Sequence, residues 1–83
     1  MLARDEREAA LRGEGCLGKA ADDEILFVLR AQDRFAPQLI EHWAHLVVQA
    51  GGAASEAKAA AAAVLAEDMR NWQARTQRAK VPD

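Results

Sequence analysis

Alanine supplies almost half of the apolar residues of this chain, and this feature limits the core that the chain can build. Twenty of the 83 residues are alanine, within an apolar share of 51%. A chain of this length buries only about 60% of its unfolded surface, and each alanine adds little to that burial. Domains with so thin a core often need a disulfide, a metal or a partner chain. The single cysteine, Cys16, excludes an internal disulfide, so we expect either a modest monomer or an oligomer.

The charge balance and the spread of apolar residues argue against two classes of protein. The net charge of −2 gives no overall attraction to nucleic acid or to anionic membranes. No apolar run approaches the roughly 20 residues that a membrane helix needs. The charged residues 1–6 also lack the apolar centre of a signal peptide. We therefore expect a cytoplasmic protein without membrane contact.

The glycine pair at 51–52 separates two helical patterns. Pro37 suits the first turn of a helix, and apolar residues then recur at helical spacing at Leu39, Ile40, Trp43, Leu46, Val47 and Ala50. Ser55 is the N-cap candidate of a second, longer helix over 55–78. The link is short, so we predict an antiparallel hairpin of helices 37–50 and 55–78.

The packing of this hairpin is also predicted from the sequence. Counting outward from the turn places Trp43 opposite the small residues 61–63. A large side chain facing small ones lets two helices approach closely. We therefore expect Trp43 and Trp72, which both fall in apolar stripes, to be core residues.

The remaining segments complete a predicted all-α single domain over residues 1–83. The five consecutive apolar residues 25–29 fit either a buried strand or a buried helical turn, and periodicity cannot separate the two. Helix formers at 30–32 and the lack of a second convincing strand favour a short helix over 23–32. Residues 1–21 are expected to be a frayed lead-in followed by a glycine-rich connector, and residues 79–83 a loose tail.

The stretch GCLGKAADDEILFVLRAQDRFAPQLIEHWA at residues 15–44 resembles a family of small bacterial and prophage-type proteins. The later alanine-rich helix, which carries Met69 and then Trp72, is similar too, so the resemblance covers about two thirds of the chain. Members often have proline where this chain has Ile25, a departure that relaxes a helix start. The resemblance implies a phage-derived accessory protein, and it transfers no catalytic or binding residue.

The glycines at 13, 15 and 18 match the G-x-G-x-x-G dinucleotide fingerprint as a string. That site requires a strand before the glycines and a helix that opens at their end, whereas a polar helical stretch precedes them here. The same residues nearly match a phosphate loop, with Lys19 in register. Ala20 then stands where the magnesium-binding hydroxyl belongs. We interpret these glycines as a connector.

Two further groups suggest chemistry and fall short of a complete site. His42 and His45 share one helical face, but zinc needs four ligands, or three and a water. Solvent-facing histidines are therefore the simpler reading, and a metal site completed by a second chain is the alternative. Cys16 lies near Lys19, and a nearby cation lowers a thiol pKa. No resolving cysteine or local histidine accompanies it, which favours an ordinary thiol.

The C-terminal part of the long helix carries an excess of cations at Arg70, Arg75, Arg78 and Lys80. These residues form a candidate nucleic-acid patch. Cations at a helix C-terminus are also favoured by the helix dipole. We prefer the second interpretation and keep nucleic-acid binding as the alternative function.

The function predicted from these observations is a non-enzymatic interaction or accessory module without a cofactor. No nucleophile and base, or pair of carboxylates, stands at catalytic spacing. The long helix is predicted to extend beyond its partner helix and to keep apolar side chains there. We therefore expect a homodimer, or binding to another protein, through Phe27, Val28, Phe35, Met69 and Trp72.

Overall fold

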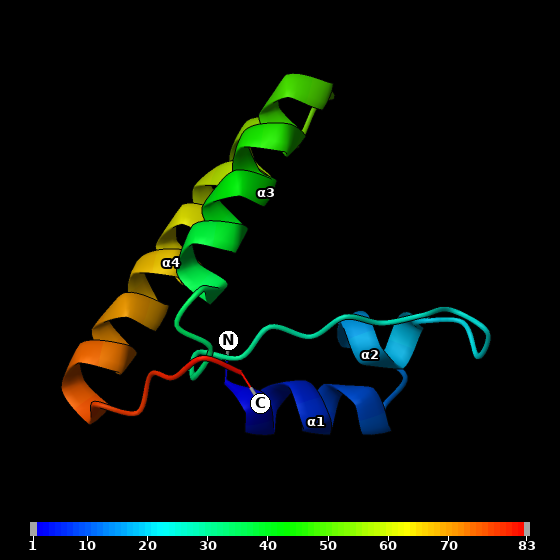
Figure 1. Cartoon of the computed structure of the whole chain (residues 1–83). Coiled ribbons are helices and arrows are strands. Elements are labelled where there is room, and N and C mark those ends of the chain that lie inside the picture. The colour runs from blue at the N-terminus through cyan, green and yellow to red at the C-terminus, as the bar shows by residue number, and fades with distance from the viewer. Residues whose placement is uncertain (1, 83) are drawn as a thin grey trace.

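The computed structural model describes residues 2–82 and contains four helices in this range. They are α1 (Ala3–Leu11), α2 (Gly15–Lys19), α3 (Ala36–Ala50) and α4 (Ser55–Thr76). The same range holds no strand beyond an isolated bridge between Asp33 and Lys80. Figure 1 shows α3 and α4 side by side and antiparallel, with α1 and α2 forming a separate pair. The predicted all-α fold is confirmed.

The helical hairpin is confirmed at both of its ends. Pro37 lies in the first turn of α3, and the helix ends at Gly51, whose φ of 77° suits glycine. Ser55 begins α4 rather than capping it, and its hydroxyl donates to the carbonyl of Gly52 at 3.0 Å. At the far end Gln77 adopts a left-handed conformation with φ of 56°, which stops α4.

The packing predicted inside the hairpin is confirmed for Ala62, which is buried, and is wrong for Trp43, which is not a core residue. Besides Pro37, the buried apolar side chains of the two helices are Ala36, Ala44, Ala62 and Ala66, which we call the alanine seam. Ala61 and Ala63 are exposed, and Trp43 is 51% exposed instead of lying in a core. The seam residues of each helix are four or eight positions apart and so lie on one face. Small buried residues on both helices let the two backbones approach closely. Leu39, Trp43 and Leu46 are then about half exposed, while Ile40 and Val47 are partly buried.

The short helix predicted over 23–32 is absent. Residues 24–30 run as an irregular, non-helical segment, followed by turns up to α3. Glu24 does not open a helix, although its carboxylate accepts a hydrogen bond from the backbone of Ala21 at 3.1 Å, as in a helix capping box. The β-branched residues Ile25 and Val28 reduce helix propensity. A helix here would be apolar on every side, and the thin core offers no surface that could cover it.

Hydrogen bonds from α4 and the C-terminal residues hold the end of this segment. The Gln73 side-chain amide donates to the carbonyls of Ala31, at 2.9 Å, and Asp33, at 3.0 Å. The backbone of Lys80 donates to Gln32 and accepts from Arg34. The tail predicted to be loose is therefore attached at Lys80, while Met1 and Asp83 lie outside the described residues.

The N-terminal residues form more regular structure than the sequence predicted. The frayed lead-in contains α1, and the glycine-rich connector contains α2, which packs against α1. A Cβ on Gly18 would meet the backbone carbon of Gly13 at 2.7 Å. The carboxylate of Glu6 accepts a hydrogen bond from the backbone of Cys16 at 3.1 Å. The glycine motif therefore serves the close approach of two short helices.

Candidate functional site

A continuous run of exposed bulky side chains lies between α2 and α3. Ile25 is 97% exposed, Phe27 is 85% exposed and Val28 is 66% exposed. Leu26 and Leu29 are less exposed and complete this run, which we call the apolar segment, residues 25–29. Within residues 2–82, its backbone amides and carbonyls make no intramolecular hydrogen bond. The segment thus presents both apolar side chains and unsatisfied backbone groups to its surroundings.

An open cavity of about 910 Å³ adjoins the apolar segment. It lies between α1, the chain at 28–32 and the C-terminal half of α4. Its larger apolar lining residues are Leu2, Leu17, Val28, Leu29, Leu65, Met69 and Trp72. Charged side chains also line it, at Glu6, Arg7, Arg30, Asp68 and Arg75. Apolar surface with charged groups is typical of a place where a partner surface or a ligand docks.

The predicted interface residues are divided between the cavity and the open surface. Val28, Met69 and Trp72 line the cavity together. Phe27 projects from the apolar segment, and Phe35 is 38% exposed beside the start of α3. The three cavity residues are thus gathered at one place, and the phenylalanines are outside it. The sequence analysis missed the contribution of the N-terminal residues, because nothing in their polar pattern indicates that Leu2 and Leu17 line the same cavity as Met69 and Trp72.

Two residues that follow Trp72 in the chain contact it, one at its indole ring and one at its backbone. The guanidinium of Arg78 lies 4.5 Å from the centre of the indole ring, within the range of a cation–π contact. Thr76 donates its hydroxyl to the backbone carbonyl of Trp72 at 2.7 Å. The indole is half-buried and forms part of the cavity wall.

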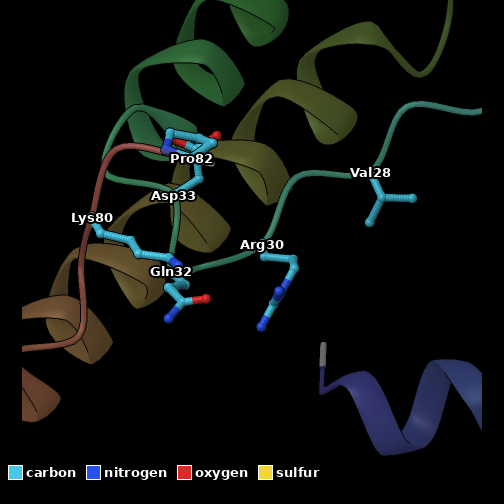
Figure 2. A pocket seen from close by; sticks show the side chains of 6 residues that line it. All are labelled: Val28, Arg30, Gln32, Asp33, Lys80 and Pro82. Atoms are coloured by element: carbon cyan, nitrogen blue, oxygen red, sulfur yellow. The ribbon is translucent and has the colours of Figure 1, made fainter.

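A smaller cavity of about 260 Å³ lies around the bridge between Asp33 and Lys80. It is lined by Val28, Arg30, Gln32, Asp33, Lys80 and Pro82, as Figure 2 shows. The Asp33 carboxylate accepts a hydrogen bond from the backbone of Phe35 at 2.8 Å. This carboxylate is therefore engaged in shaping the turn before α3.

The predicted cation group of α4 does not form one continuous patch. Arg70 donates to both carboxylate oxygens of Glu41 on α3, one of them at 3.0 Å, and lies 3.6 Å from Glu67. These hydrogen bonds lower the pKa of Glu41 below its ordinary value of 4.5, and Glu41 raises the pKa of Arg70. Arg75 lines the large cavity, and Arg78 covers Trp72. The charge of Arg70 is thus largely compensated.

The residues considered for metal and thiol chemistry stay apart. His42 and His45 are exposed on α3, and Cys16 is exposed on α2. Among residues 2–82, no three histidine, cysteine or acidic side chains gather as a metal site would require. In the same range no helix combines the length and the apolar character needed to cross a membrane.

Comparison with known proteins finds no matching family model, no matching curated protein and no matching solved structure.

Proposed function

We propose that this protein is a non-enzymatic interaction module of the cytoplasm that associates with itself, or with another protein, through the apolar segment and the adjoining cavity. One observation carries the proposal: Ile25, Phe27 and Val28 stand in the open beside a cavity with an apolar wall. Burying one such side chain contributes about 1.5–3 kcal/mol. An association that covers the segment therefore gains energy that the monomer lacks.

Self-association is the first expectation. In a two-fold dimer each chain presents the same patch to the other, so the exposed surface of one chain covers the identical surface of its partner. The length of α4 also supports this surface as the dimer interface. At about 1.5 Å per residue, its 22 residues extend well beyond the 15 of α3 and carry Met69 and Trp72 to the cavity. The proposed interface consists of Phe27, Val28, Met69 and Trp72, with Phe35 at its edge.

Nucleic-acid binding receives less support as a function. A protein that binds phosphates presents several free cations on one surface. Here the guanidinium of Arg70 is paired with Glu41, and that of Arg78 is stacked on Trp72. Filter binding at two salt concentrations tests this alternative, because affinity that falls steeply with salt indicates phosphate contacts.

The test of the proposed function is light scattering coupled to size exclusion, with wild type and Phe27→Asp compared. We expect wild type at micromolar concentration to have a mass well above the 9.0 kDa of one chain, and Phe27→Asp to approach 9.0 kDa. Phe27 is exposed, so circular dichroism should show an unchanged helix content. Leu11→Asp is the matched control, because Leu11 is 90% exposed on α1 and lies outside the apolar segment.

Two results would contradict the proposal. A wild-type mass near 9.0 kDa throughout the concentration range would contradict self-association. In pull-downs, wild type and Phe27→Asp would each serve as bait. If both also retained the same proteins, the proposal that this segment binds other proteins would be wrong.

A further inference from the structure

The apolar segment and its two flanking residues have a pattern that is symmetric about its centre. Residues 24–30 read Glu-Ile-Leu-Phe-Val-Leu-Arg, with an acid at one end, a base at the other and Phe27 in the middle. The side chains of Val28 and Arg30 project to the same side in Figure 2, as alternate residues of an extended strand do. In the first half of the segment, Leu26 is 44% exposed and lies between the more exposed Ile25 and Phe27.

We propose that residues 24–30 of two copies pair as antiparallel strands centred on Phe27. This inference rests on the proposed self-association and names the surface and register that perform it. In this register each Glu24 faces the partner's Arg30, and each Phe27 faces the partner's Phe27. The backbone groups of residues 25–29 lack intramolecular partners, so they are available for hydrogen bonds between the strands.

Charge selects the antiparallel arrangement over the parallel one. A parallel pair in register would place Glu24 beside Glu24 and Arg30 beside Arg30, and adjacent like charges destabilise a strand pair. The antiparallel pair converts the same four groups into two cross-strand ion pairs. The side chain of Arg30 makes no ion pair within residues 2–82, so pairing across the dimer costs no existing salt bridge.

The paired strands would also cover one another's apolar side chains. Ile25, Phe27 and Leu29 alternate along the strand and share one face. Directly opposite residues have Cβ atoms only about 4.5–5.5 Å apart, so each Ile25 contacts the partner's Leu29. A free two-stranded ribbon is only marginally stable. Val28 and Leu29 line the large cavity, which places this ribbon against existing apolar surface.

A charge-swap experiment on the full chain tests the register, with the dimer dissociation constant measured by sedimentation equilibrium. Arg30→Glu places Glu24 opposite a second carboxylate at both ends, and we expect the dissociation constant to rise about tenfold or more. Adding Glu24→Arg restores opposite charges and should return it to within about threefold of wild type. Arg4→Glu is the matched control, because it makes the same charge change on the exposed surface of α1.

A disulfide experiment reads the register directly in a Cys16→Ser background. Phe27→Cys should form an intermolecular disulfide on mild oxidation, because directly opposite Cα atoms lie about 4.5–5.5 Å apart. Leu26→Cys should stay reduced, since its counterpart is a diagonal neighbour about 7–8 Å away.

The outcomes separate this inference from the proposed function. A wild-type dimer that responds equally to Arg30→Glu and Arg4→Glu, or that links through Leu26→Cys and not through Phe27→Cys, would overturn the strand pairing and leave the interaction module standing. A wild type that stays monomeric would overturn both the pairing and the self-association. Weakening by Arg30→Glu with recovery in the double variant supports the pairing.

Discussion

Two parts of this protein differ in how well they bury their apolar side chains. One is the hairpin of α3 and α4, and the other is the N-terminal part at residues 2–30. The hairpin has small buried side chains, and its two helices lie in direct contact along the alanine seam. The N-terminal part contains several bulky apolar residues, yet neither α1 nor α2 has a buried residue. An open cavity lies between the two parts. Burial in this protein thus follows the fit between surfaces rather than the size of the apolar side chains.

The largest loss of stability is expected from a substitution in the alanine seam of the hairpin. Ala66 is fully buried, so Ala66→Leu should overpack the contact and cost about 1–3 kcal/mol of unfolding free energy. In a domain of this size, that loss lowers the melting temperature by about 4–8 °C for each kcal/mol. Thermal melts by circular dichroism give the measurement. Ala61→Leu is the control, because Ala61 is exposed and should accept the larger side chain with little change. Equal losses in the two variants would show that the seam lies elsewhere.

A smaller and more local effect is expected in the N-terminal part. Gly18→Ala adds a Cβ that would meet the Gly13 backbone at 2.7 Å, so α2 must move away from α1. Amide hydrogen exchange should accelerate in residues 3–19 and stay unchanged in α3 and α4, because the two helix pairs do not pack directly on each other. Gly52→Ala is the reciprocal control: its positive φ of 109° makes alanine unfavourable there, so exchange should accelerate around the link between α3 and α4 and stay unchanged in residues 3–19. Faster exchange throughout the hairpin after Gly18→Ala would contradict the separation of the two parts.

The smallest expected effect concerns the ion pair that links α3 to α4. The hydrogen bond from Arg70 lowers the pKa of Glu41 in the folded state. The stability that this pair contributes is therefore complete above the unfolded value of 4.5, and it is lost as the pH falls through the lower folded pKa. Melts between pH 7 and pH 3 (about the range in which carboxylates titrate) should show a slightly weaker acid dependence for Glu41→Gln than for wild type.

Glu8→Gln is the control for this comparison, because Glu8 is exposed on α1 and forms no ion pair within residues 2–82. Identical acid profiles for Glu41→Gln and Glu8→Gln would indicate that solvent screens the pair completely. Exposed ion pairs contribute little in general, so we expect the difference between the two variants to be small.

Local sequence signals were sufficient to predict the helical hairpin, but they were insufficient to predict which residues of the two helices contact each other. Pro37 and the glycines at 51–52 fix where α3 begins and ends, and these signals act over a few residues. Which face of α3 turns inward depends on the other helix. The stripe containing Trp43 looks like a core on a single helix, but alanines on α4 made a closer contact possible on the neighbouring face.

The candidate site illustrates the same limit. Met69 and Trp72 are recognisable from the sequence because they continue an apolar stripe past the end of the partner helix. The state of residues 25–29 is not recognisable, because a continuous apolar run has neither the helical nor the strand period. The pair of Glu41 and Arg70 joins residues 29 positions apart, so it follows only when the register of the two helices is known.

The alanine seam also restricts how this sequence can change over evolutionary time. Ala36 and Ala66 have no exposed surface, and Ala44 and Ala62 are only 8% and 7% exposed, so a larger side chain at these positions must displace its neighbours. Glycine itself costs about 1 kcal/mol in a helix interior. These four positions therefore have almost no neutral substitutions, and a population carrying this protein would lose variants there first. The exposed apolar positions have no such steric limit inside the monomer, so a restriction on variation at Ile25 and Phe27 would indicate that a partner covers them.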